Sequence, residues 1–208
     1  EAYIDPSEVR TKVGTDKPLD ETFFLVDVIS GEKRKLALTE LPGVRDDPLA
    51  ELNAAAAARK KAKAAAAAQD DARDEDPKPD AKTGPKPADA AKSKQRAVYA
   101  HGAARRGVRW TDDGARVALC LFAYDNKDRW LAEIDWPAAT VRPLHRLSDA
   151  AWVNDSAFNE FDWLPGGSGL WFTSEESGYS QLHVRRGEAT AAITRGKFEV
   201  SSVQPDVA

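Results

Sequence analysis

Short apolar runs separated by tight turns dominate both ends of the chain. Thr22–Ile29 is a β-branched and aromatic run, and Lys33–Leu38 returns from the turn Ser30-Gly31-Glu32. Runs of this kind bounded by turn residues predict strands joined as hairpins. The second half of the chain continues in the same way and predicts two groups of four strands. They are expected at 107–111, 116–124, 129–135 and 141–147, and at 159–164, 169–174, 180–185 and 189–194.

One strand pattern occurs twice, 53 positions apart. Val108–Gly114 and Phe161–Gly167 each carry an aromatic strand that runs into an Asp-Gly or Gly-Gly turn, and a second apolar strand follows at once. Trp110 aligns with Trp163 without a gap. A period of roughly 40–50 residues with several short strands is typical of β-propeller blades. The expected fold class is therefore all-β, a partial β-propeller with two full blades plus fragments of two others.

The middle of the chain breaks this pattern. Leu49–Ala68 consists almost entirely of strong helix formers, and Asp47-Pro48 before it is a typical helix start. Asp70–Lys94 is rich in charge and proline, which is typical of disorder. The expected organisation is a partial blade at 1–45, a low-complexity helical-to-disordered insertion at 46–96, and propeller blades at 97–208. The last of these parts includes 197–203 as the start of the next blade.

Composition excludes several classes of function. The chain has 30 Lys plus Arg against 34 Asp plus Glu, so its net charge of −4 gives no general attraction to nucleic acid. It has no apolar run of the ~18 residues that a membrane span needs. Cys120, the single cysteine, lies in an apolar strand and is expected to be a buried, inert thiol.

The chain starts at Glu1 and contains no methionine, so we expect a processed form or a segment of a longer protein, and the blade count favours a segment.

Motifs for catalysis and for metal binding are missing from the sequence. It contains no Gly-x-Ser-x-Gly, and its three histidines, His101, His145 and His183, are expected to be structural. Asp125–Arg129 is rich in oxygen ligands, but it lacks the glycine and the distal glutamate of an EF-hand. We interpret it as a polar hairpin turn. No catalytic residue, metal site or cofactor is expected within these 208 residues.

The segment Thr173–Val184 resembles a blade motif of the dipeptidyl-peptidase-IV-like, prolyl-oligopeptidase-type serine peptidases. In that motif a serine, two or three polar residues, a glycine and an aromatic residue precede a Leu or Ile. Asp149–Val153 is similar to the family segment that leads into the first strand of this blade, and Thr194–Val200 is similar to the segment that crosses into the next. Val13-Gly14 followed by Phe23–Asp27 is similar to an earlier strand of the family.

The resemblance implies that this chain is the non-catalytic propeller of a serine exopeptidase. Such a propeller gates and positions peptide substrates for an α/β-hydrolase domain that belongs to the same full-length chain but is absent here. It further implies periplasmic or secreted localisation and allows a homodimer of the full protein, and the segment alone should be inactive. Two alternatives are a stand-alone TolB-like propeller that serves as a binding or scaffold module, and the propeller of an acylaminoacyl peptidase or oligopeptidase.

Five residues are candidates for contact with a peptide substrate. Glu175 and Glu176 resemble the paired glutamates that hold a substrate amine in this family, although the family's pair lies on a different segment. Their alternative role is in a solvated turn. Trp152 and Phe158 could form an apolar pocket wall beside Asn154, or they could pack between blades. The family's arginine in that loop is replaced here by Asn154-Asp155.

Overall fold

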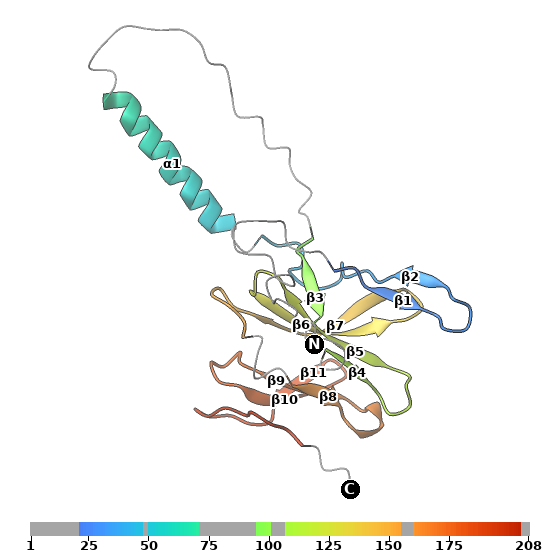
Figure 1. The fold of residues 1–208 in the computed structure, drawn as a ribbon. Helices are drawn as coiled ribbons and strands as arrows, with labels where there is room; N and C mark the ends of the chain where they lie inside the picture. The colour runs from blue at the N-terminus through green and yellow to red at the C-terminus, as the bar shows by residue number, and fades with distance from the viewer. Residues whose placement is uncertain (1–20, 48–49, 71–94, 101–106, 155–159, 205–208) are drawn as a thin grey trace, which may run out of the picture. The chain divides into compact units, whose positions relative to one another are not determined.

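The structure is a computed structural model that describes residues 21–47, 50–70, 95–100, 107–154 and 160–204 (Figure 1). Contacts divide the chain into two units. One unit combines residues 1–45 with 95–208, and the other is 46–94.

The described part of the second unit is helix α1 (Ala50–Asp70), so the helix predicted at 49–68 is confirmed. Side chains from Glu51 to Lys63, apart from position 52, are exposed, because alanine and lysine provide no apolar stripe that could be buried. The stretch predicted to be disordered lies outside the described residues after Asp70. No helix in the described part of the chain is long and apolar enough to cross a membrane.

The first complete blade is an antiparallel sheet of five strands. Its inner edge is split, because β3 and β4 pair with different halves of β5 on the same side. The strands are β3 (Val98–Ala100), β4 (Val108–Trp110), β5 (Val117–Ala123), β6 (Asp128–Asp135) and β7 (Thr140–Ser148). The four predicted strands are confirmed within a few residues. The sequence did not indicate β3, because three residues carry no measurable period.

The second complete blade has four antiparallel strands in the order β11-β10-β9-β8. They are β8 (Phe161–Trp163), β9 (Leu170–Ser174), β10 (Gln181–Arg186) and β11 (Ala189–Ala192). The repeat seen in the sequence is also a repeat of register: Trp110 pairs with Val117, and Trp163 pairs with Leu170 seven positions on. The five-stranded sheet and the four-stranded sheet confirm the all-β, partial-propeller fold class.

The N-terminal hairpin is shorter than predicted. β1 (Phe24–Val26) pairs with β2 (Lys33–Lys35), but the strand predicted to reach Ile29 ends at Val26. The carboxylate of Asp27 accepts hydrogen bonds from the backbone N–H groups of Ile29 (2.9 Å) and Ser30 (2.8 Å), and this side-chain turn ends the ladder. Val28 and Ile29 are consequently 93% and 95% exposed.

Residues 197–203 were expected to open a further blade, but they form no strand in the structure. Val200 instead exchanges hydrogen bonds with Ser180, at the start of β10, through the backbone and the serine hydroxyl. A strand needs a continuous partner, and Ser180 provides only a local one.

Two apolar cores lie on opposite faces of the first blade. Leu119, Leu121 and Ala123 face a core shared with Leu25, Leu36, Leu38, Leu41 and Val44 of the N-terminal segment. The intervening residues Ala118, Cys120 and Phe122 face a core shared with Phe161, Leu170 and Phe172 of the second blade. Both faces of β5 are therefore covered, which explains its uninterrupted apolar sequence.

The turns between strands gather at two ends of the blades (Figure 1). The end that we call the Trp136 end holds the turns β1–β2, β4–β5, β6–β7, β8–β9 and β10–β11. The end that we call the Glu176 end holds the turns β5–β6 and β9–β10 together with the segment 149–153 between blades. Contacts within each end support the grouping: Arg34 donates to the carbonyl of Trp136 at one end, and Lys127 donates to that of Ala151 at the other.

Candidate functional site

The Glu175-Glu176 pair lies in the turn between β9 and β10. Glu176 spans the two blades, because its carboxylate is 2.9 Å from Nε2 of His183 on β10 and 3.4 Å from Nε2 of His145 on β7. The ring of Phe172 packs against both imidazoles, with centroids 4.4 Å from His145 and 5.4 Å from His183. Glu176 therefore links the two blades in addition to its place in the turn, and we call its contacts with His145 and His183 the clasp.

A buried cation lies beneath this clasp. Arg129 on β6 is 1% exposed and donates a 3.0 Å hydrogen bond to the carbonyl of Thr173 on β9. Burial lowers the pKa of Arg129, and the negative charges of Glu175 and Glu176 oppose that shift. Burial, followed by the positive charge of Arg129, lowers the pKa of His145 to about 4. His145 is therefore neutral at neutral pH, while the acids balance the arginine.

Glu175 differs from its neighbour. It is half-buried, its backbone carbonyl accepts from the N–H of Gly178, and its carboxylate forms no ion pair within the described residues. The two acids therefore differ in their contacts, because only Glu176 pairs with histidines. A role of either acid in binding an amine remains a prediction.

The other predicted substrate residues lie at the same end. Trp152 is 75% exposed, and it is held in place because the Asp149 carboxylate accepts from the N–H groups of Ala151 (2.6 Å) and Trp152 (3.0 Å). Within the described residues, the Trp152 indole does not pack between the two complete blades. Asn154 is half-buried, and Phe158 lies outside the described residues.

Ion pairs hold the turn between β5 and β6, which lies in the segment Asp125–Arg129 that was compared with an EF-hand. Arg96 donates to Asp125 (2.8 Å) and to Asp128, and Arg146 donates to Asp128 (2.6 Å). The backbone N–H of Asn126 bonds to the carbonyl of Ala123 in a tight turn between β5 and β6. These carboxylates are occupied by guanidinium groups, and no group of three or more His, Cys, Asp or Glu in the described parts of the chain is arranged to hold a metal ion.

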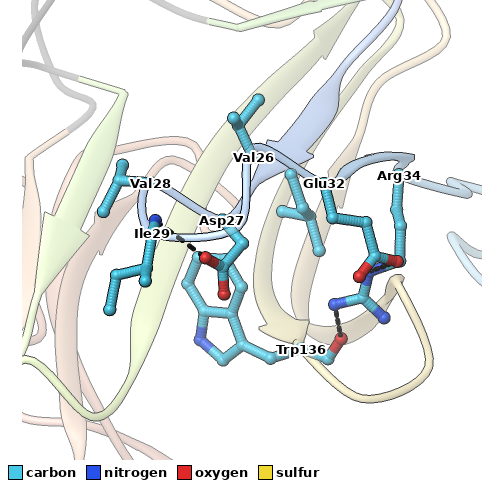
Figure 2. Close-up of a pocket in the computed structure, with 8 residues that line it drawn as sticks. Val26, Asp27, Val28, Ile29, Glu32, Arg34 and Trp136 are labelled. Carbon is cyan, nitrogen blue, oxygen red and sulfur yellow. Dashed lines mark hydrogen bonds and ion pairs between the residues drawn. The ribbon is translucent and has the colours of Figure 1, made fainter.

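A pocket lies at the opposite, Trp136 end. Figure 2 shows it between the β1–β2 turn and Trp136. Its volume is about 410 Å³. Val26, Val28 and Ile29 provide apolar walls, and the indole of Trp136 stacks on that of Trp110 with centroids 5.5 Å apart. Backbone hydrogen bonds from Ser30 and Ile29 lower the pKa of Asp27, so one wall carries a fixed negative charge.

A second pocket at this end lies between the two complete blades and is lined by three arginines. Neither pocket is lined by the five residues predicted from the sequence. The sequence reasoning did not identify these arginines or the role of Arg129. The signal available for Arg129 was a charged residue at the start of the predicted strand 129–135, directly before the apolar pair Trp130-Leu131.

Comparison with known families shows which family this chain belongs to. The family model for the dipeptidyl peptidase IV (DPP IV) N-terminal region matches residues 98–206, just over half of the chain and both complete blades. The chain belongs to this family. The resemblance carried by Thr173–Val184 is thereby confirmed.

A solved structure of low sequence identity is also similar to part of this DPP IV N-terminal region. The crystal structure of TolB from Acinetobacter baumannii is similar at 19% identity with a TM-score of 0.32, over 44% of this chain and 21% of that one. The chain thus spans about a fifth of the length of that protein. A search of curated protein sequences gives no match.

Proposed function

We propose that this chain is the propeller portion of a dipeptidyl-peptidase-IV-like serine exopeptidase, which gates and positions peptides for a hydrolase domain elsewhere in the full-length protein. The observation that carries the proposal is the match of the DPP IV N-terminal region over both complete blades. The sequence itself has no Gly-x-Ser-x-Gly, so the nucleophile must come from outside these 208 residues. Positioning of this kind accelerates a reaction by reducing its entropic cost.

The Glu176 end suits this role. Trp152 presents an exposed indole on a segment fixed by Asp149, and Glu175 provides a carboxylate next to Glu176 in the β9–β10 turn. An indole wall and an acid are the groups that would bind an apolar side chain and a peptide amine. We propose peptides with a free N-terminus as the partners, and export to the periplasm as the location.

The test is a kinetic assay of the full-length protein with two chromogenic substrates, an Ala-Pro anilide and its N-acetylated form. The expected result is hydrolysis of the free-amine substrate alone and complete loss of activity after treatment with a serine-directed fluorophosphonate. Cleavage of only the acetylated substrate would indicate an acylaminoacyl peptidase. Cleavage of neither by the full-length protein would contradict the proposal, and fractionation of expressing cells tests the location separately.

A further inference from the structure

The groove between the two complete blades at the Trp136 end collects cationic side chains from both sheets. Arg116 and Arg142 come from the first blade, and Arg185 comes from the second. Leu144, Leu170 and the indole of Trp163 complete the walls of a pocket of about 120 Å³. The site therefore combines positive charge with an apolar surface.

The first carboxylate in this groove, that of Glu133, is a fixed part of the protein. Arg116 binds it with two hydrogen bonds of 2.6 and 2.9 Å, and Arg142 donates to the same group. Burial alone would raise the pKa of Glu133, but the hydrogen bonds from Arg116 and Arg142 outweigh burial and the pKa is lowered. Arg116 is further fixed by a 2.8 Å hydrogen bond to the carbonyl of Gly167 and by stacking over Trp163.

The second carboxylate, that of Glu188, is held only loosely. It lies in the β10–β11 turn, is 84% exposed, and reaches back to Arg185 (2.7 Å) and Arg142 (3.4 Å). The pair between Glu188 and the half-exposed Arg142 lies at the surface, where ion pairs contribute about 0–1 kcal/mol. Glu188 can therefore leave the groove at little cost.

Arg185 is the opposite case, a cation that the fold keeps in the groove. Its side chain is 12% exposed, and its buried Nε has no hydrogen-bond partner among the described residues. This Nε is not accessible from the groove, so Arg185 offers a ligand its terminal Nη groups, one of which pairs with Glu188. With Glu133 already neutralising one of the three guanidinium groups, the departure of Glu188 would leave two positive charges in excess.

We propose that this groove binds a small carboxylate, which replaces Glu188 between Arg142 and Arg185. Planar guanidinium groups bind carboxylates with paired hydrogen bonds. The small volume of about 120 Å³ suits a short carboxylic acid or an acidic side chain. Glu188 competes with the bound carboxylate for Arg142 and Arg185. This ligand site does not depend on the proposed peptidase function.

The test is a titration of the full-length protein with ¹³C-propionate at low ionic strength, followed by NMR. Propionamide, of the same shape without charge, is expected not to bind. Inorganic phosphate is expected to bind more weakly than propionate, because it lacks the apolar part. A capped tripeptide Gly-Glu-Gly with blocked termini distinguishes an acidic side chain from a free acid as the source of the carboxylate: tighter binding of the peptide assigns the side chain, and tighter binding of propionate assigns the free acid.

Two variants move the affinity in opposite directions. Glu188→Ala removes the competitor and should tighten propionate binding about two- to fivefold, the range that a surface ion pair of up to about 1 kcal/mol allows. Arg185→Gln should weaken it by about tenfold or more, since a hydrogen bond to a charged group is lost. Arg195→Gln, an exposed arginine of the same unit, is the control and should bind as the wild type does. Unchanged or weaker binding by Glu188→Ala, or equal binding of propionamide, would overturn the proposal even if Arg185→Gln failed to fold.

Discussion

Arg129 of the first blade donates a 3.0 Å hydrogen bond to the backbone carbonyl of Thr173 in the second. A fully buried guanidinium therefore crosses from one sheet to the next. Arg129 joins the two blades where their sheets face each other, whereas the clasp of Glu176 joins them at the Glu176 end.

Arg129→Ala should destabilise the propeller by about 2–4 kcal/mol, because it removes this hydrogen bond and leaves a cavity. Arg129→Met should cost less, because it fills most of the volume without a buried charge. Urea denaturation followed by tryptophan fluorescence measures both. Equal stability of Arg129→Ala and the wild type would show that the residue is not a link between the blades.

Protonation of His145 should destabilise the protein as the pH falls. Its pKa is lowered from 6.5 to about 4 by burial and by Arg129, while Glu176 and the neighbouring His183 are the other groups that face it. A histidine with a lowered folded-state pKa contributes stability that is complete above pH 6.5 and is lost as the pH falls toward 4. Urea midpoints measured from pH 7.5 to 4.5 should decline, and the decline should be shallower in His145→Gln. An identical slope in the two proteins would contradict the assignment.

Gly169→Ala should destabilise the contact between β9 and β10. A Cβ at this position would lie 2.5 Å from the backbone carbonyl oxygen of Arg185, which cannot move away without distorting the strand. Overpacking of this kind costs about 1–3 kcal/mol. Gly114→Asn is the matched control: a Cβ there meets nothing within 4 Å, and asparagine tolerates the positive φ of 68°. The melting temperature of the control should change least.

Cys120 should react only when the protein unfolds. The thiol is buried in the core between the blades, and burial raises its pKa to about 11, so thiolate is scarce at neutral pH. Labelling with a thiol-specific disulfide reagent should be slow in buffer and fast in urea. Rapid labelling of the native protein would show that the two blades separate in solution.

Trp152→Ala should change substrate binding and leave stability nearly unaltered, because the indole is mostly exposed. In the full-length protein we expect a KM raised about three- to tenfold for an Ala-Pro anilide, with little change in kcat, since an apolar wall is worth about 1 kcal/mol. Phe24→Ala, an exposed aromatic on the N-terminal hairpin, is the control for loss of surface area. A KM equal to that of the wild type would remove Trp152 from the proposed site.

The sequence predicted the strands well where the chain carries a strong local signal. Val117–Ala123 is uninterruptedly apolar because both of its faces are covered, and Trp110 and Trp163 precede equivalent turns, so the repeat and its register could be recognised. The exposed run Val28-Ile29 was predicted wrongly as strand, because its apolar character is overridden by the side-chain turn of Asp27.

The candidate sites were predicted less completely, for a physical reason. The sequence by itself determined the strand pattern, the two repeated blades and the helical insertion, since these follow from periodicity and propensity over neighbouring residues. Only the tertiary structure decided that Glu176 meets His145 and His183, and that Arg116, Arg142 and Arg185 share one groove. Glu176 and His183 are close in sequence, but His145 is 31 residues from Glu176 and the three arginines are spread over both blades. These groups meet because successive sheets stack face to face, which no local pattern in the chain encodes.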